Sequence, residues 1–205
     1  MPTNILQLHA SAVRLSVTAV SAVRPDSLDR PTPCSEWRLR ELLAHMTVQN
    51  LGFAAAVEGV EADWELGELG PDPVADYTAA SARVVAAFEQ VGALERLLDL
   101  PEISRTQLIP GSLAIRFHLV DSVVHAWDVS RSLGEQVELD PELGDAAYRI
   151  AAKVPDGETR LAPNAAFAPS LPSADSATQL DKIVSLLGRA PDWTSGVVAR
   201  RRVSG

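Results

Sequence analysis

Hydrophobic residues recur along most of this chain at steps of three and four positions, the spacing of an amphipathic helix. The first such segment runs from about Asn4, a good N-terminal cap, to Val23, and Pro25 follows it. Four long segments of this kind, joined by polar loops, predict an all-α helical bundle. The apolar face of the first segment consists of Ile5, Leu8, Ala12, Leu15, Ala19 and Val23.

Breaks in the pattern set the expected bounds of the other elements. We expect one domain, 1–205, with a core over 4–153 and an extension over 154–205. The residues after 188 are expected to turn away from the bundle. The second helix is expected to begin at Ser35 or a close neighbour, and the third to follow Pro73 and run to about Leu98. The remaining helices are expected from Ser112 to Leu133, from Asp140-Pro141 onward, and from about Ser176 to Gly188. A short extended piece is expected within 101–111 and a frayed end at Arg200–Arg202.

Composition narrows the function classes. The 205 residues carry a formal net charge of −9, which argues against a nucleic-acid partner and against an anionic membrane surface. No apolar run reaches the ~18 residues of a membrane span. The lone cysteine, Cys34, and an N-terminus without a signal-peptide pattern lead us to expect a cytoplasmic protein.

The fourth helix carries the candidate chemistry. Asp121 and His125 lie four residues apart, and His118 lies seven residues before His125, so the three share one face. The rest of this helix is apolar, which is typical of a buried helix. Buried carboxylates and imidazoles need partners, because unpaired polar groups are costly in a low dielectric. A divalent metal is one partner, and a plain hydrogen-bonded Asp–His pair is the other.

A third ligand would come from one of the chain's few other histidines. His45 is the best candidate, because it flanks the apolar stripe of the second helix, and Gly52 leaves room there for a close helix approach. Helical bundles build metal sites from such facing helices. The spacing alone leaves open a metal site and a satisfied core histidine.

Two segments resemble a known family. Residues 32–45, which open the second helix and end at His45, are similar to the corresponding motif of the DinB-like, YfiT-like metal-binding superfamily, in the branch of mycothiol-dependent maleylpyruvate isomerase. Residues 121–128, with Asp121 four residues before His125-Ala-Trp-Asp, resemble that branch's second motif. Residues 187–193 resemble the ending of short actinobacterial members. The resemblance implies a DinB-like four-helix bundle with short additional C-terminal helices.

The resemblance also implies a ligand set and a cofactor. Carried over residue by residue, the metal ligands are His45, Asp121 and His125. Zinc is the expected metal, with nickel, iron or manganese as alternatives, and mycothiol is the thiol that the family suggests. Two departures are expected: Asp121 stands where isomerase-type members have Glu, and those enzymes carry a further C-terminal domain for which this chain has no room.

Three functions follow as hypotheses. The first is a metal-dependent enzyme that uses a thiol cofactor for S-transfer or isomerisation of a small molecule. The second is a non-catalytic protein that binds a metal or a small molecule, and the third is a metal-dependent hydrolase. A homodimer is compatible with each of them.

Four neighbouring residues have simpler interpretations. We expect His118 to pack near the start of its helix. The alternatives are a fourth metal ligand, a residue that hydrogen-bonds a ligand without touching the metal, or a general base. Asp128 either orients the His125 ring or lies solvated at the helix end. Cys34, beside an expected helix N-terminus that would lower its pKa, is interpreted as a small turn residue. His9 is interpreted as a helix-face residue.

Overall fold

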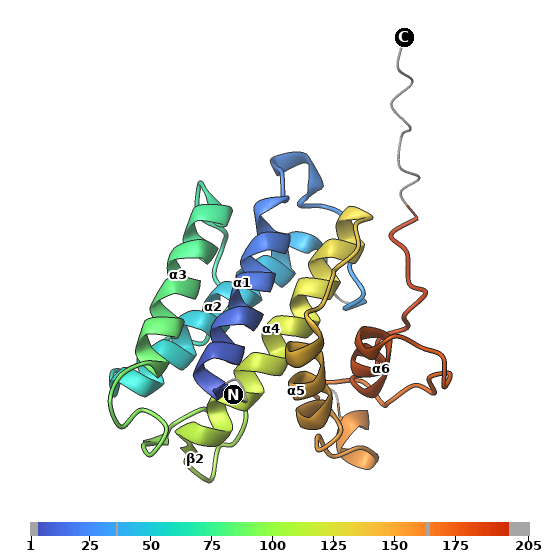
Figure 1. The fold of residues 1–205 in the computed structure, drawn as a ribbon. Coiled ribbons are helices and arrows are strands. Elements are labelled where there is room, and N and C mark those ends of the chain that lie inside the picture. Colours follow the sequence, from blue (N-terminus) through green and yellow to red (C-terminus); the bar gives the residue numbers. More distant parts are fainter. Residues whose placement is uncertain (1–3, 36, 163–164, 197–205) are drawn as a thin grey trace.

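The computed structural model describes residues 4–35, 37–162 and 165–196, and these ranges are almost entirely helical (Figure 1). Arg200–Arg202 lie outside them. The helices are α1 (Ile5–Ser21), α2 (Leu39–Glu58), α3 (Pro73–Phe88), α4 (Gly111–Leu133), α5 (Pro141–Ala151) and α6 (Gln179–Leu186), with short 3-10 turns η1 (Pro25–Ser27) and η2 (Glu158–Leu161).

The first four helices form the bundle. Helix α1 packs along α4 and also contacts α3, while α2 packs along α3 and meets α4 over a shorter length (Figure 1). Helix α5 lies against α4, and α6 packs on α5. The prediction of an all-α, DinB-like bundle with short additional C-terminal helices is therefore confirmed.

Local chemistry explains several helix ends. The Asn4 side chain accepts a hydrogen bond from the Leu6 amide and caps α1, and Asp140 caps α5 in the same way. Gly134, with φ of 78°, ends α4 in the left-handed conformation that glycine adopts without steric cost. These three positions match the sequence-based prediction.

The start of α2 differs from the prediction. The helix begins at Leu39, not near Ser35. Pro31 and Arg38 form an isolated antiparallel bridge, and the Thr32 hydroxyl donates hydrogen bonds to the carbonyls of Cys34 and Trp37. These bonds hold the segment in a non-helical turn, so the helix starts only after it.

The end of α3 also differs, because this helix stops at Phe88 and not near Leu98. Gly92 has φ of 77°, which breaks the helical path, and Val91 just before it is 97% exposed. The chain then forms a small antiparallel pair of β1 (Leu97–Leu98) and β2 (Ile109–Pro110), with Leu97 opposite Pro110. The expected extended piece before α4 is thus present.

Two further expectations need correction. The last helix, α6, is shorter than expected, because Thr178 caps it and so fixes its start at Gln179. The room beside Gly52 is filled by a loop residue and not by a helix, since a Cβ at Gly52 would lie 2.5 Å from the Trp64 ring.

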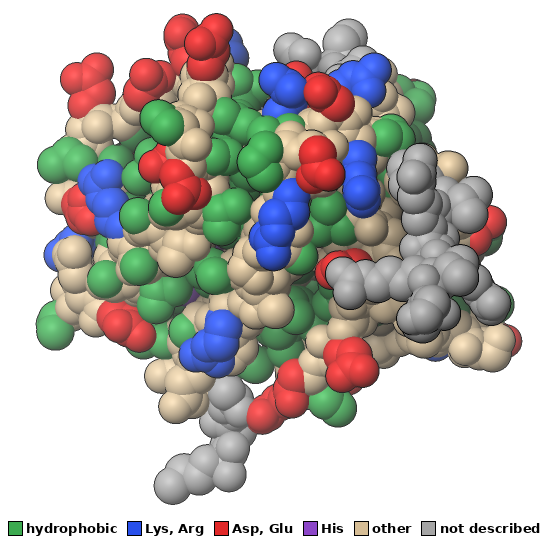
Figure 2. Space-filling view, turned by 90° about the horizontal axis from the view of Figure 1, so that it is seen from above, with side chains coloured by type: hydrophobic (Ala, Val, Ile, Leu, Met, Phe, Trp, Pro, Cys, Tyr) green, Lys and Arg blue, Asp and Glu red, His purple; other side chains and the backbone are tan. Residues whose placement is uncertain are grey.

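The histidines lie inside the bundle. His9, His118 and His125 are buried and His45 is partly buried, so almost no histidine shows on the surface seen from above (Figure 2). On that face acidic and basic side chains are interspersed and form no basic stripe. None of the helices in the described ranges is long and apolar enough to cross a membrane.

Candidate metal centre

Helix α4 brings two potential metal ligands together. Asp121 and His125 are one turn apart, and Oδ1 of Asp121 lies 3.2 Å from Nε2 of His125. The His125 side chain is buried, while the Asp121 side chain remains 28% exposed. The Asp121 carboxylate is therefore accessible from solvent, so an external ligand can reach the pair from that side.

Helix α2 supplies the third residue. The rings of His45 and His125 stand nearly perpendicular, with centroids 5.3 Å apart. One ligand atom from each of His45, Asp121 and His125 lies within 4.8 Å of the other two. Ligands of one zinc ion, each about 2.0–2.2 Å from the metal, lie roughly 3–4 Å apart in tetrahedral geometry. The structure thus brings all three predicted residues together, and a small contraction would let them share an ion.

Asp128 orients His125 from behind. Its Oδ2 lies 2.9 Å from Nδ1 of His125, and its side chain is fully buried. A carboxylate that accepts a hydrogen bond from Nδ1–H fixes the ring so that Nε2 points toward Asp121, as in metal sites where a carboxylate orients a histidine ligand. Of the two interpretations of Asp128, orientation of the ring is confirmed and the solvated position is wrong.

The charges of these groups suit a cation. Burial lowers the pKa of His45 to about 4, so this ring is neutral and has a free lone pair at pH 7. Burial alone would lower the pKa of His125, but the Asp121 and Asp128 carboxylates outweigh it and raise that pKa to about 9. Burial would likewise raise the pKa of Asp121, but the charge of His125 holds it below its usual value. In the metal-free protein a proton on Nε2 therefore neutralises Asp121.

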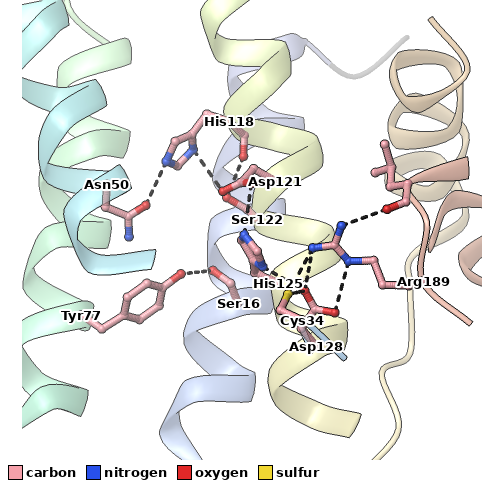
Figure 3. Close-up of polar contacts among 11 residues, drawn as sticks. Ser16, Cys34, Asn50, Tyr77, His118, Asp121, Ser122, His125, Asp128 and Arg189 are labelled. Carbon is pink, nitrogen blue, oxygen red and sulfur yellow. Dashed lines mark hydrogen bonds and ion pairs between the residues drawn. The ribbon is translucent and has the colours of Figure 1, made fainter. Parts of the chain in front are cut away.

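The C-terminal segment reaches this site, contrary to the expectation that it turns away. Arg189 is only 8% exposed, and its Nη2 lies 3.2 Å from Oδ2 of Asp128 and 3.4 Å from the sulfur of Cys34 (Figure 3). Burial and the Asp128 carboxylate raise the pKa of the Cys34 thiol to about 12. The expected lowering of the pKa is wrong, because α2 begins five residues later and the thiol donates a hydrogen bond to Oδ2 of Asp128 at 3.4 Å.

His118 and His9 form a separate buried pair. Nδ1 of His118 lies 2.9 Å from Nε2 of His9. Nε2 of His118 lies 2.9 Å from Oδ1 of Asn50 (Figure 3). The amide oxygen can only accept, so Nε2 of His118 donates to it and Nδ1 accepts from His9. Both nitrogens of His118 are engaged, which leaves no lone pair for a metal. The sequence pattern did not predict the contact between His9 and His118.

Two more side chains of or near α2 face the site. The ring of Trp37 lies against that of His45, with centroids 4.6 Å apart, and covers one side of it. Gln49 lies one turn beyond His45 on the same face and is 8% exposed. Because Asn50 bonds His118 while His45 meets His125, α2 and α4 run antiparallel, which places Gln49 level with Asp121. Among the described residues, no group bonds the Gln49 amide, so it is free to bind a ligand.

Comparison with solved structures shows the fold. The crystal structure of the mycothiol-dependent maleylpyruvate isomerase aligns with a TM-score of 0.65 at 16% identity, covering 92% of this chain and 89% of that one. A mutant of that enzyme aligns with a TM-score of 0.59 at 14% identity, covering 72% of this chain and 66% of the mutant chain. Both alignments include the helical bundle, and the identities of 14–16% make them evidence for the fold alone.

Sequence comparison shows the family. Rv0738 and MT0763, from Mycobacterium tuberculosis strains H37Rv and CDC 1551, are each 30% identical to this chain over 190 residues, which cover 90% of this chain and 97% of the relative. Residues 9–130, more than half of the chain, match the family described as the mycothiol maleylpyruvate isomerase N-terminal domain. The chain therefore belongs to the mycothiol maleylpyruvate isomerase N-terminal domain family.

Proposed function

We propose that this protein binds one divalent metal through His45, Asp121 and His125, and that the metal serves a thiol-dependent isomerisation or S-transfer on a small molecule. The observation that supports it best is the convergence of two imidazoles and one carboxylate from facing helices, with Asp128 orienting the His125 ring. A set of three protein ligands leaves at least one position for a further ligand. Zinc is the first candidate, and iron, nickel and manganese accept the same ligand types.

Each side chain has a distinct task in this proposal. His45 and Asp121 are already in the neutral and ionised forms that bind a cation, while His125 must release one proton. When bound, the metal would lower the pKa of a thiol ligand so that it is held as a thiolate at neutral pH. Gln49 is placed to donate a hydrogen bond to an oxygen of the thiol or of its reaction partner. Trp37 shields the His45 ring from water.

The family supports a thiol cofactor, and mycothiol is the natural probe. We expect zinc-loaded protein to bind mycothiol in isothermal titration calorimetry and the chelated protein to bind it much more weakly. A maleylpyruvate isomerisation assay with mycothiol then tests the reaction. If the loaded protein ignores mycothiol while still binding zinc, the thiol-dependent function is wrong, and a hydrolase or a non-catalytic metal-binding protein is the better interpretation.

Metal affinity should depend on pH through His125. Its pKa in the metal-free protein is raised to about 9, so below that value zinc must displace one proton. The zinc association constant should rise about tenfold per pH unit from pH 6.5 upward and level off near pH 9. Titration calorimetry at pH 7 in two buffers of different ionisation enthalpy should show release of about one proton per zinc. A pH-independent affinity would show that His125 is not a ligand.

Gln49→Leu tests the ligand-binding role of the free amide. Loss of one neutral hydrogen bond should weaken binding of mycothiol or of its reaction partner roughly 3- to 10-fold, with zinc affinity unchanged. The same substitution should leave the free energy of unfolding nearly unchanged, because the Gln49 amide has no hydrogen-bond partner among the described residues to lose.

Asn50→Leu is the matched control for Gln49→Leu. Asn50 is the next residue of α2, and its amide bonds both His118 and Ser81. Its replacement should lower the free energy of unfolding by about 1–3 kcal/mol, because a buried partner is left unpaired. If Gln49→Leu destabilises the protein as much as Asn50→Leu does, the Gln49 amide has a structural partner and the binding role is wrong.

A further inference from the structure

A second group of metal-ligating side chains lies on the other side of the His125 ring. One ligand atom from each of Cys34, His125 and Asp128 lies within 4.8 Å of the other two. Oδ2 of Asp128 is 2.9 Å from Nδ1 of His125 and 3.4 Å from the Cys34 sulfur. A thiol, an imidazole and a carboxylate at this spacing are a zinc-type ligand set in their own right.

This second group already contains a cation of the protein. The Arg189 guanidinium contacts both outer members: Nη2 lies 3.2 Å from Oδ2 of Asp128 and 3.4 Å from the Cys34 sulfur, and Nε lies 3.5 Å from Oδ1 of Asp128 (Figure 3). Nη1 donates to the Leu187 carbonyl at 2.9 Å, which anchors the guanidinium to the backbone after α6. The ring of Phe167 lies 5.6 Å from its central carbon.

We propose that Arg189 is a built-in cation that fills the second group and restricts metal binding to the Nε2 side of His125. A guanidinium is permanently charged, and a metal held by Cys34 and Asp128 would lie beside it and be repelled. Among the described residues, no arginine or lysine forms a hydrogen bond or ion pair with His45 or Asp121, and the charge of Arg189 acts on these two only at longer range. The inference rests on the proposed function, which it deepens by explaining why one of two available ligand sets is used.

The selection has a chemical consequence for the site. A metal held by Cys34, His125 and Asp128 would lie on the Nδ1 side of the ring, would already carry a soft protein thiolate, and would leave His45 and Asp121 unused. By keeping Cys34 and Asp128 engaged, Arg189 preserves a site with two imidazoles, one carboxylate and room for a further ligand. We therefore assign Arg189 as a positioning residue that determines which ligands the metal receives.

Cobalt(II) is the probe, because thiolate ligation gives an intense near-ultraviolet charge-transfer band that nitrogen and oxygen ligands do not give. We expect cobalt-loaded wild-type protein to lack this band and Arg189→Met to show it. Arg189→Lys keeps the positive charge and should resemble the wild type. Adding Cys34→Ser to Arg189→Met should abolish the band, which identifies the sulfur.

Several outcomes would overturn the inference. It is wrong if Arg189→Met is folded by circular dichroism, binds cobalt and shows no thiolate band, or if the wild type already shows that band. Should Arg189→Met not fold alone, refolding it and Arg189→Gln with cobalt is decisive: recovery with the band supports the inference, and failure to recover refutes it. The two proposals can fail separately. If the wild type binds no cobalt while Arg189→Met binds it and shows the thiolate band, the proposed function is wrong but the role of Arg189 stands.

Discussion

His125→Ala should abolish tight metal binding, with the zinc dissociation constant rising by more than about 100-fold. The substitution removes one of the two proposed ligands on α4, whereas loss of a residue that only orients a ligand typically costs about 10- to 100-fold. Alanine is the best helix former, so α4 itself should persist. In the wild type, zinc at 100 times its dissociation constant should add about 2.7 kcal/mol to the free energy of unfolding. Thermal melts with zinc and with a chelator should differ for the wild type and coincide for the variant.

His118→Gln is the matched control for this prediction. His118 is as deeply buried as His125 and lies on the same helix, seven residues earlier, but both of its ring nitrogens bond His9 and Asn50. The variant should be less stable yet keep the zinc-induced rise in melting temperature. If His118→Gln loses zinc as completely as His125→Ala does, His118 is a ligand and the site has been assigned wrongly. Chelation of the wild type should lower its melting temperature and leave the helical circular dichroism at room temperature, because the apolar core does not depend on the metal.

The fold and the three candidate ligands could be predicted because they depend on local rules. The helical period alone places Asp121 and His125 on one face, and the small number of histidines makes His45 the natural third ligand. The ends of α1, α4 and α5 follow from Asn4, Gly134 and Asp140, whose side chain or conformational freedom satisfies the helix terminus directly. The helix ends and the Asp121–His125 pair need no knowledge of which helices are neighbours, whereas the choice of His45 also rests on the resemblance to the family motif.

Features that depend on contacts between distant segments could not be predicted. Arg189 lies 61 residues after Asp128, and nothing in the local pattern after α6 shows that this arginine returns to α4. Cys34 looked like a thiol near a helix N-terminus, and only the packed structure shows that it faces Asp128. The pairing of His9 with His118 joins residues 109 positions apart. In each case the decisive partner comes from another element, which a periodic pattern does not specify.

Arg189→Ala should lower the free energy of unfolding by about 3 kcal/mol in the metal-free protein. The substitution leaves the Asp128 carboxylate, which is fully buried, without its guanidinium. Breaking a buried ion pair by removing one partner typically costs about 3–5 kcal/mol. We expect the lower end, because Nδ1 of His125 still bonds Asp128 at 2.9 Å. Urea denaturation in the presence of a chelator measures this change without a contribution from bound metal.

The chain offers an exposed pair as the matched control. Arg40 and Asp29 form a shorter ion pair, at 2.6 Å, but their side chains are 46% and 74% exposed. Arg40→Ala should therefore cost only about 0–1 kcal/mol, because water screens this pair and solvates the remaining carboxylate. Replacing Arg189 and Asp128 together should cost less than the sum of the two single replacements, since neither charge is then left buried alone. Equal losses for Arg189→Ala and Arg40→Ala would mean that the C-terminal segment does not hold Arg189 on Asp128 in solution.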